Sequence, residues 1–568
     1  MNLFMAIKNY IERMIQEAGP GMKLLLMDAE TTSIVSMIFA QSEIFQSEVY
    51  LFEDINSSIR ETIKYVKCIT YLRPTNKNIQ LLGEELKYPK YGAYYIYFTN
   101  VIMRSDLKTI AESDEYETVK EIKEFYGDFM AINSFAFTLN IKQIYQNFGW
   151  DPLALQRSVE GITSIFLSLK RKPIIRYQSN SDMTLKLAEN VQKCISRDHE
   201  LFNFRQNESS LLLLIDRRDD PVTPLLHQWT YQAMVHDLIG IYNNRVNLKT
   251  APGVPKNLKE IVLSAEHDGF YSQNMYLNFG EISQNIKILM EHFQKKSQCQ
   301  QKVESISDMK AFIENYPHFK KLSGKISKHV TLLTELSRLI SNFEILKLSE
   351  IEQSLACGST DHLKDLQEIK NALNNDKIKE VDLLKLVLLY ALCYERLPNN
   401  DITGLIKILR KHGFIEKYIK MVHSIVDFGG CSFRNNDLFG TQDPIAYTKK
   451  IFKGMKGIEN IYTQHKTLIE ELLDQILKIK LKENLYPYFG SIKNEKFSDI
   501  VIYIVGGLTY EEILATYMFN KNNNSGPQAM QVLIGGTNIL NSQMVQELDR
   551  NRLSKRGEPS LGPITPGF

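Results

Sequence analysis

The first 140 residues alternate short apolar runs with segments of helical periodicity. Apolar runs of four or five residues are too short for helices and predict buried strands. The segments between them, near 32–46, 76–86 and 105–126, carry a pattern that predicts helices. This alternation is typical of a parallel sheet covered on both faces. The predicted strands are Lys23–Met27, Val49–Phe52, Cys68–Leu72 and Tyr94–Phe98.

The N-terminal segment has the pattern of an amphipathic helix. Leu3, Ile7, Ile11 and Met14 recur at helical spacing, and charged residues interrupt them. This pattern differs from that of a signal peptide, which has a continuous apolar stretch. No uncharged apolar run approaches the ~20 residues that span a bilayer. We therefore expect a cytoplasmic protein whose membrane contact comes only through partners.

From about residue 280 to 480 the strand patterns give way to helical ones. Ile282 and Ile286 begin one amphipathic stripe, and Val330 and Leu333 begin another. Val381–Tyr394 is apolar nearly all round, which predicts a helix inside a bundle. Pro317 disfavours helix at Tyr316, so we expect a break there.

Strand patterns return near the C-terminus. Val501–Val505 and Gln531–Ile534 are short, mainly apolar runs that predict buried strands, as Leu211–Ile215 does earlier in the chain. Thr223 and Pro224 predict the start of a helix after that earlier strand. The flanking α/β pieces are short, which suggests one shared sheet with the helical block inserted. The predicted divisions are 1–140 (domain 1), 141–245 (first segment of domain 2), 246–480 (domain 3), 481–553 (second segment of domain 2) and 554–568 (mobile tail).

Charge and cysteine content narrow the function classes. The chain has 68 basic and 66 acidic residues and a net charge of +2, with no basic block. This balance argues against a nucleic-acid-binding protein. The six cysteines lie far apart and show no Cys-x-x-Cys spacing. We expect a reducing compartment, with neither a disulfide framework nor a structural zinc site.

Two strand–Gly-Gly–helix turns are the strongest hint of an enzyme, because a helix N-terminus can bind phosphate. They are Gly506-Gly507 and Gly535-Gly536. Thr509 and Glu512 form a capping-box pattern, which would satisfy the helix amides internally and place a carboxylate there. No lysine follows at Walker A spacing. A nucleotide- or sugar-using enzyme stays open as an alternative, and we predict no cofactor.

Acidic and histidine side chains gather after the strand Leu211–Ile215 and could suggest a metal site. Their spacing fits no common ligand pattern, and Arg217 and Arg218 would oppose a cation. We therefore predict a local salt-bridge network, with no metal ligand and no catalytic residue. The residues concerned are Asp216, Asp219, Asp220, His227 and His236.

Three segments resemble the Sec/Munc (SM) family of SNARE regulators. The longest is Ile215–Leu238, IDRRDDPVTPLLHQWTYQAMVHDL, and the others are Val505–Glu512 and Ile534–Asn541. Further segments resemble the vacuolar-sorting branch of this family. They are Gly19–Asp28, Phe125–Phe129, Lys453–His465 and Lys480–Gly490.

The resemblance implies an α/β fold with a large all-α insertion, arranged as a three-domain arch around a central cavity. It also implies a monomeric, non-enzymatic protein that binds a syntaxin of the trans-Golgi network or endosome. The vesicle SNARE, the assembled SNARE complex and an endosomal Rab-effector tether are further expected partners. The expected location is peripheral, on Golgi and endosomal membranes. Alternatives are an SM protein of plasma-membrane exocytosis or vacuolar fusion, or a general helical scaffold.

The resemblance also places candidate binding residues. Leu107, Ile122 and Glu124 match the pocket for the syntaxin N-terminal peptide. Pro317 matches the hinge of a helical hairpin in domain 3, and Val330 matches its groove for the vesicle SNARE. The segment Thr31–Glu53 corresponds to the inner surface that faces syntaxin helices. From periodicity alone, Leu107, Ile122 and Val330 are ordinary core positions.

Overall fold

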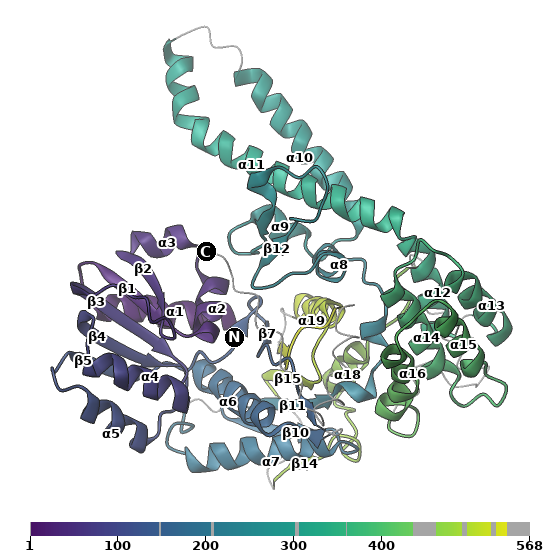
Figure 1. Ribbon diagram of the computed structural model, residues 1–568, viewed down its shortest axis with the longest axis horizontal. Helices are drawn as coiled ribbons and strands as arrows, with labels where there is room; N and C mark the ends of the chain where they lie inside the picture. Colours follow the sequence, from purple (N-terminus) through teal and green to yellow (C-terminus); the bar gives the residue numbers. More distant parts are fainter. Residues whose placement is uncertain are drawn as a thin grey trace.

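The computed structural model describes residues 2–146, 149–205, 209–300, 306–358, 360–434, 462–490, 497–523 and 530–541. For 293–300 and 306–321 it describes the backbone alone. Figure 1 shows a first α/β unit on one side, a second α/β unit in the middle, and helices beyond and above it. The expected fold class, α/β with a large all-α insertion, is confirmed.

The first unit is a parallel sheet with helices on both faces. Its strand order is β2-β1-β3-β4-β5, and every pairing is parallel. In β1, Leu25 and Met27 face the α1–α2 side, while Leu24 and Leu26 face the α4–α5 side. The elements are α1 (Leu3–Glu17), β1 (Lys23–Met27), α2 (Ala29–Ile38), α3 (Gln41–Gln46), β2 (Val49–Asp54), β3 (Ile63–Leu72), α4 (Asn76–Lys87), β4 (Tyr91–Phe98), α5 (Arg104–Ser113) and β5 (Val119–Glu124).

The predicted helix over 105–126 is wrong beyond Ser113. Helix α5 ends there, and Val119–Glu124 is the edge strand β5. The Asp114 carboxylate accepts hydrogen bonds from the backbone N–H groups of Thr118 (2.9 Å) and Val119 (3.0 Å), which fixes a turn between the two elements. A spacing of three between apolar residues suits a helix, but pairing with β4 decides the outcome.

The second unit is one sheet built from distant parts of the chain. Its strand order is β14-β10-β11-β15-β16-β7-β6, and β11 pairs in parallel with β15. The two α/β pieces therefore share a sheet, and the chain enters it before residue 140, at β6. The strands are β6 (Met130–Ala131), β7 (Ala136–Thr138), β10 (Pro173–Tyr177), β11 (Ser210–Asp216), β14 (Tyr488–Phe489), β15 (Asp499–Val505) and β16 (Gln531–Gly536).

Helices cover this second sheet, and short elements connect it to the rest of the chain. The predicted helix start at Thr223 is wrong: residues 223–225 form one 3-10 turn, and the α-helix begins at Tyr231. The elements are the strands β8 (Tyr145–Gln146) and β9 (Gly149–Trp150), the 3-10 turns η1 (Arg217–Asp219) and η2 (Thr223–Leu225), and the helices α6 (Pro152–Leu169), α7 (Asp182–Arg197), α8 (Tyr231–Leu238), α18 (Leu468–Leu477) and α19 (Tyr510–Asn523).

The insertion is mainly helical. As predicted, α14 is buried nearly all round. Helices α10 and α11 extend away from the body of the molecule as a hairpin (Figure 1). The elements are β12 (Arg245–Asn247), η3 (Lys256–Leu258), β13 (Glu260–Val262), α9 (Gly269–Asn274), α10 (Phe279–Gln300), α11 (Ile306–Asn342), α12 (Ile345–Cys357), α13 (His362–Leu373), α14 (Glu380–Tyr394), α15 (Ile402–Lys411) and α16 (Glu416–Gly429).

The expected helix break at Tyr316 is wrong. Helix α11 runs without interruption from Ile306 to Asn342 and includes Pro317. A proline removes one backbone hydrogen bond and strains one turn, but a long helix can continue across it. Within the described residues, no helix combines the length and apolar character that a bilayer crossing requires.

Candidate partner-binding surfaces

In the structure, Leu107 and Ile122 lie on the same side of the first sheet, where α4 and α5 cover it. Leu107 lies on α5 and Ile122 on β5, and both are half-buried. Both pack against the apolar cluster between the sheet and α4–α5. Met103, one helical turn before Leu107, is 67% exposed. The α5–β5 surface, meaning Met103, Leu107 and Ile122, therefore combines accessible apolar side chains with a rigid base.

Glu124 lies at the end of β5, beside the loop that leads into α5. Its carboxylate accepts a hydrogen bond from the backbone N–H of Ile102 (2.8 Å) and another from the Tyr126 hydroxyl (2.8 Å). Burial and the adjacent Glu124 carboxylate raise the pKa of Tyr126. Glu124 therefore holds the loop before α5 in place and adds negative charge beside the α5–β5 surface.

Val330 lies on α11, near the base of the helical hairpin. It is half-buried and packs against the apolar cluster formed by α8, α9, α10 and α11. The backbone at Pro317 is helical, and its side chain lies outside the described part of the chain. The two residues predicted for the vesicle-SNARE site therefore share one continuous helix.

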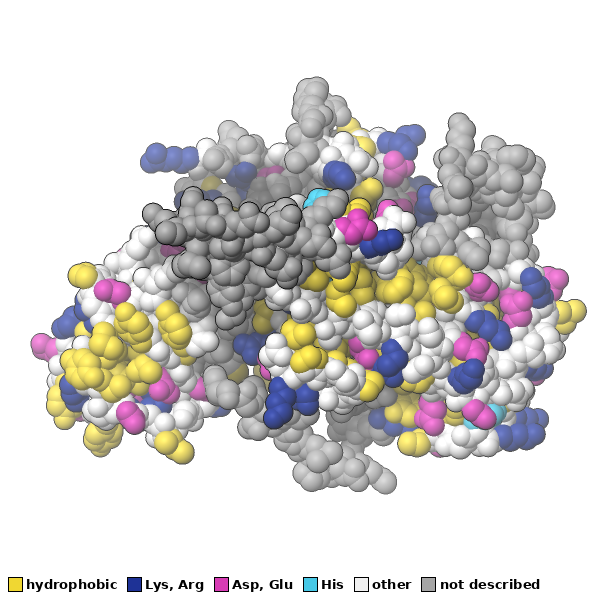
Figure 2. Space-filling model, turned by 90° about the horizontal axis from the view of Figure 1, so that it is seen from above, with side chains coloured by type: hydrophobic (Ala, Val, Ile, Leu, Met, Phe, Trp, Pro, Cys, Tyr) yellow, Lys and Arg dark blue, Asp and Glu magenta, His cyan; other side chains and the backbone are white. Residues whose placement is uncertain are grey.

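An aromatic patch lies within the segment Thr31–Glu53. The ring of Phe45 on α3 is 6.5 Å from that of Tyr50 and 6.1 Å from that of Phe52, both on β2. Tyr50 is 48% exposed, and β2 is an edge strand. Figure 2 shows apolar side chains gathered over this end of the first unit, at the left. Exposed aromatic side chains in a group are typical of protein-binding surfaces.

The Gly506-Gly507 turn is filled by protein groups. Thr509 and Glu512 form the predicted capping box, with Thr509 N–H donating to Glu512 (2.8 Å) and Glu512 N–H donating to Thr509 Oγ1 (3.3 Å). The Arg217 guanidinium donates to both Glu512 oxygens (2.7 and 2.6 Å) and to the Gly507 carbonyl (3.0 Å). An ion pair therefore occupies the place where a phosphate would bind.

The acidic and histidine residues after β11 do not converge on one point. Asp216 pairs with Arg218 (2.6 Å), and the Asp220 carboxylate accepts a hydrogen bond from Thr223. His236 packs its ring against Tyr510. Among the described residues, no group of three potential ligands could hold a metal ion. The predicted salt-bridge network is confirmed for Asp216, Arg217 and Arg218.

His227 joins the second unit to the helical insertion. Its Nδ1 lies 2.8 Å from Glu352 on α12, and its Nε2 lies 3.5 Å from Asp382 on α14. Burial opposes the charge on His227, but the carboxylates of Glu352 and Asp382 raise its pKa to about 10. Burial likewise opposes the charge on Asp382, whose pKa His227 and Lys385 lower to about 2. His227 is therefore a buried cation at neutral pH.

His227 should give the fold a specific pH dependence. Since its pKa is raised from 6.5 to about 10, its contribution to stability is full below pH 6.5. That contribution falls as pH rises through about 10 and is on the order of a few kcal/mol. In thermal unfolding between pH 6.5 and 10 we expect His227→Gln to lose less stability with rising pH than the wild type. Equal slopes for the two proteins would contradict this assignment.

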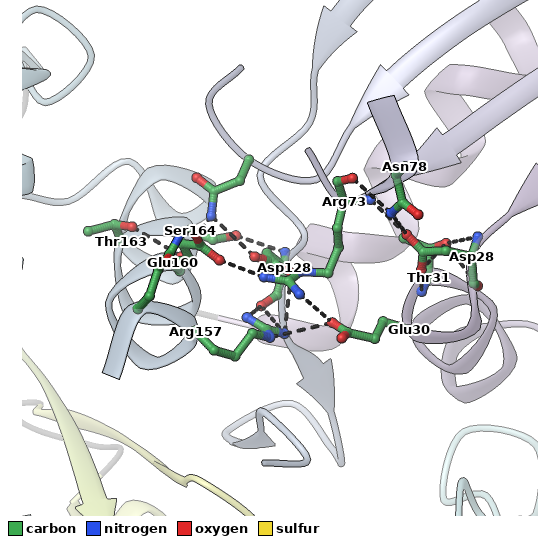
Figure 3. A network of polar contacts seen from close by, with 12 residues as sticks. Asp28, Glu30, Thr31, Arg73, Asn78, Asp128, Arg157, Glu160, Thr163 and Ser164 are labelled. Carbon is green, nitrogen blue, oxygen red and sulfur yellow. Dashed lines mark hydrogen bonds and ion pairs between the residues drawn. The ribbon is translucent and has the colours of Figure 1, made fainter. Parts of the chain in front are cut away.

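A second buried network joins the first unit to α6 (Figure 3). Arg73, just after β3, contacts Asp128 (2.9 Å) and Glu160 on α6 (2.5 Å). Arg157 on α6 contacts Asp128 (3.2 Å) and Glu30 on α2 (3.4 Å). Charged side chains of the first unit and of α6 thus form ion pairs with one another. The sequence gives no motif for this network, because its members are far apart along the chain.

A protein-family model matches most of this chain. The model described as the Sec1 family matches residues 23–547. The chain belongs to the Sec1 family. The match includes both sheets and the helical insertion, and among the described residues it leaves out only 2–22, which contain α1.

Several curated proteins are similar over nearly the full length. Vacuolar protein sorting-associated protein 45 of Mus musculus is 52% identical, with 99% of this chain and 98% of that protein covered. The Dictyostelium discoideum protein of the same name is 44% identical, with 99% of each covered. The Saccharomyces cerevisiae protein is 33% identical over 96% of this chain and 98% of its own.

Solved structures agree with this Sec1 family assignment. The structure "SM Protein Vps45 in Complex with Qa SNARE Tlg2 (1-310)" matches with a TM-score of 0.89 and 38% identity, covering 97% of this chain and 98% of that chain. The Unc18–syntaxin 1 complex of Monosiga brevicollis matches with a TM-score of 0.79 at 18% identity, covering 97% of this chain and 100% of that chain. At that identity the second likeness supports the fold alone.

Proposed function

We propose that this chain binds a syntaxin-type SNARE and promotes SNARE complex assembly for vesicle docking and fusion. One observation carries the proposal. A Vps45 that is 38% identical over 97% of this chain was solved in complex with the Qa SNARE Tlg2. We further propose that the transport step is that of the trans-Golgi network and endosome, leading toward the vacuole or lysosome, and the vacuolar sorting in the names of the curated relatives supports this. The chain works through binding, without a cofactor or a chemical reaction.

A rigid binding protein can promote assembly by reducing the entropy that assembly costs. Separate SNARE chains lose translational and rotational freedom when they meet, and flexible segments become ordered. The described units share buried polar joints at His227 and at Asp128. These joints hold the first unit to α6 and the second unit to α12 and α14, which limits the freedom of chains bound to these parts.

The α5–β5 surface is the proposed site for the N-terminal peptide of the syntaxin. Leu107 and Ile122 provide an apolar floor, and Glu124 adds negative charge at its edge. Such a surface suits a short peptide with one apolar anchor and one basic residue.

Leu107→Arg tests this site. Replacing the apolar floor with a charge should weaken binding of a syntaxin N-terminal peptide by about 30-fold or more, the loss typical of a central anchor. The affinity would be measured by titration with a labelled peptide. Thr109→Arg, which adds the same charge at an exposed position of α5, should bind normally. Unchanged affinity in a folded Leu107→Arg protein would reject the site.

The α10–α11 hairpin is the proposed site for the vesicle SNARE, with Pro317 at its hinge and Val330 in its groove. The continuous course of α11 favours an extended hairpin over a bent one. A helix laid along it would dock through apolar anchors spaced at i, i+3, i+4 and i+7. The assembled SNARE complex would contact the same hairpin.

The remaining parts of the proposal concern organisation and place. We propose a monomer with domain limits near 140, 245, 480 and 553, located peripherally on Golgi and endosomal membranes through its SNARE partners. An endosomal Rab-effector tether is a further proposed partner. A nucleotide- or sugar-using enzyme is disfavoured because Arg217 and Glu512 fill the Gly-Gly turn.

A further inference from the structure

The helical insertion touches the first unit through a small polar seam. The turn before β12 meets α2, where the Asn243 side-chain amide donates to Ser33 Oγ (3.1 Å). The Asn244 amide lies 3.5 Å from the Met37 carbonyl oxygen. Nearby, His267 Nε2 lies 3.6 Å from the Glu43 carboxylate on α3. Figure 1 shows β12 and α9 lying across from α2 and α3.

The two asparagines lie in a tight turn with a well-defined backbone geometry. Tyr242 and Arg245 exchange backbone hydrogen bonds of 2.9 and 2.8 Å across it. Asn243 and Asn244 both have positive φ angles, 49° and 60°. Two left-handed residues in a two-residue loop are typical of a type I′ turn, where asparagine and glycine are favoured. The backbone therefore has a defined type I′ geometry, and the hydrogen bonds that join the turn to α2 come from the two asparagine side chains.

The seam lacks a shared apolar core. The cluster that holds α8–α11 and the β12–β13 ribbon contains no residue of the first unit, within the described residues. The Asn243 side-chain oxygen is buried and accepts no hydrogen bond from the residues that the structure describes. An unsatisfied buried oxygen reduces the stability of the contact. By contrast, the first unit and α6 belong to one continuous apolar cluster, which also holds helices α12–α16 of the insertion but not the β12–β13 ribbon.

We propose that the Asn243–Asn244 turn is a releasable latch, which holds the start of the helical insertion against α2–α3 of the first unit. The inference rests on the proposed function in one respect: α2–α3 lies in the segment expected to face syntaxin helices. A helix laid on that face competes with the turn for Ser33 and for Met37. The closed seam therefore lowers the rate at which a helical partner enters, and opening of the seam precedes entry.

Hydrogen exchange of the full chain, read by mass spectrometry, tests the latch itself. Asn243→Gly removes the amide side chain but keeps a residue that tolerates positive φ. Ser33→Ala removes the acceptor on α2. In both variants, peptides covering α2 and 242–248 should exchange about twofold to tenfold faster, as expected for the loss of one hydrogen bond. Ser36→Ala is the matched control, because its hydroxyl donates to the Ser33 carbonyl within α2 (2.9 Å) and, among the described residues, makes no contact with the turn.

Partner binding tests what the latch controls. The association rate with the cytosolic part of a Qa-SNARE should rise about threefold or more in Asn243→Gly. Unchanged exchange at the seam, or an equal increase in Ser36→Ala, would overturn the latch. An association rate that stays equal or falls would overturn its control of entry. If the wild type bound no Qa-SNARE, the proposed function would fail, while the exchange result would still decide whether the seam opens.

Discussion

Replacing Arg217 with methionine is expected to destabilise the second unit by about 3–5 kcal/mol, because it leaves a carboxylate buried without its partner. Glu512 is 2% exposed, and Arg217 is its ion-pair partner. Burial raises the pKa of Glu512, and Arg217 opposes that shift. The measurement is the apparent midpoint of thermal unfolding. Since a lone buried carboxyl is tolerated only when protonated, the loss should be larger at pH 8 than at pH 5.

Two further variants separate this ion pair from nonspecific effects. Arg410→Met breaks an exposed pair with Glu416, whose side chains are 53% and 56% exposed, and should shift the unfolding midpoint much less than Arg217→Met does. The double variant Arg217→Met/Glu512→Gln removes the buried charge and should regain part of the lost stability. A double variant less stable than Arg217→Met would show that packing, rather than charge, dominates at this site.

Apolar patterning predicted most of the strands and the buried helix α14 from the sequence. Runs such as Leu211–Ile215 are too short for helices. They are apolar at every position because both faces of a parallel strand are covered. Apolar patterning gave a wrong prediction where pairing with a neighbouring strand decides the secondary structure. Val119 and Ile122 fit a helix by spacing, yet the Asp114 turn and β4 place them in an edge strand. At Pro317 a local preference was overridden within a 37-residue helix.

Some features of the candidate sites could be predicted from the sequence, and others could not. Family resemblance named Leu107 and Ile122, and in the structure both pack against the same apolar cluster, one from a helix and one from a strand. Periodicity alone could not predict this placement, because the position of α5 relative to β5 depends on how the sheet is assembled. The capping box of Thr509 and Glu512 was predictable, since its partners are three residues apart. The Arg217 partner of Glu512 was not, because 295 residues separate the two.

The first unit has two different contacts with its surroundings. The joint with α6 combines a continuous apolar cluster with buried charges at Arg73 and Asp128. The seam with the helical insertion is polar and small. Breaking the joint exposes apolar surface and unpaired charges, whereas opening the seam exposes only groups that water can satisfy. We therefore expect the part of the helical insertion around β12 to separate from the first unit at the seam, while α6 and the first unit stay together.

Asp128→Asn tests this view of the joint. Asp128 is fully buried between Arg73 and Arg157, and it also accepts a hydrogen bond from Asn100 (3.3 Å). Asparagine keeps the shape but removes the charge that two guanidinium groups share. We expect a loss of about 3 kcal/mol, at the low end for a broken buried pair, because Arg73 and Arg157 keep Glu160 and Glu30 but lose the fully buried carboxylate that they share. Thermal unfolding gives the size of this loss.

Hydrogen exchange locates the loss and distinguishes the joint from the seam. In Asp128→Asn, peptides covering α6 and residues 126–131 should exchange faster, while those covering 242–248 should not change. Asp474→Asn is the matched control: it makes the same substitution in an exposed pair with Lys478, whose side chains are 56% and 54% exposed. That change should cost less than about 1 kcal/mol. Faster exchange at 242–248 in Asp128→Asn would mean that the two contacts are coupled, and the division into a fixed joint and a releasable seam would then be wrong.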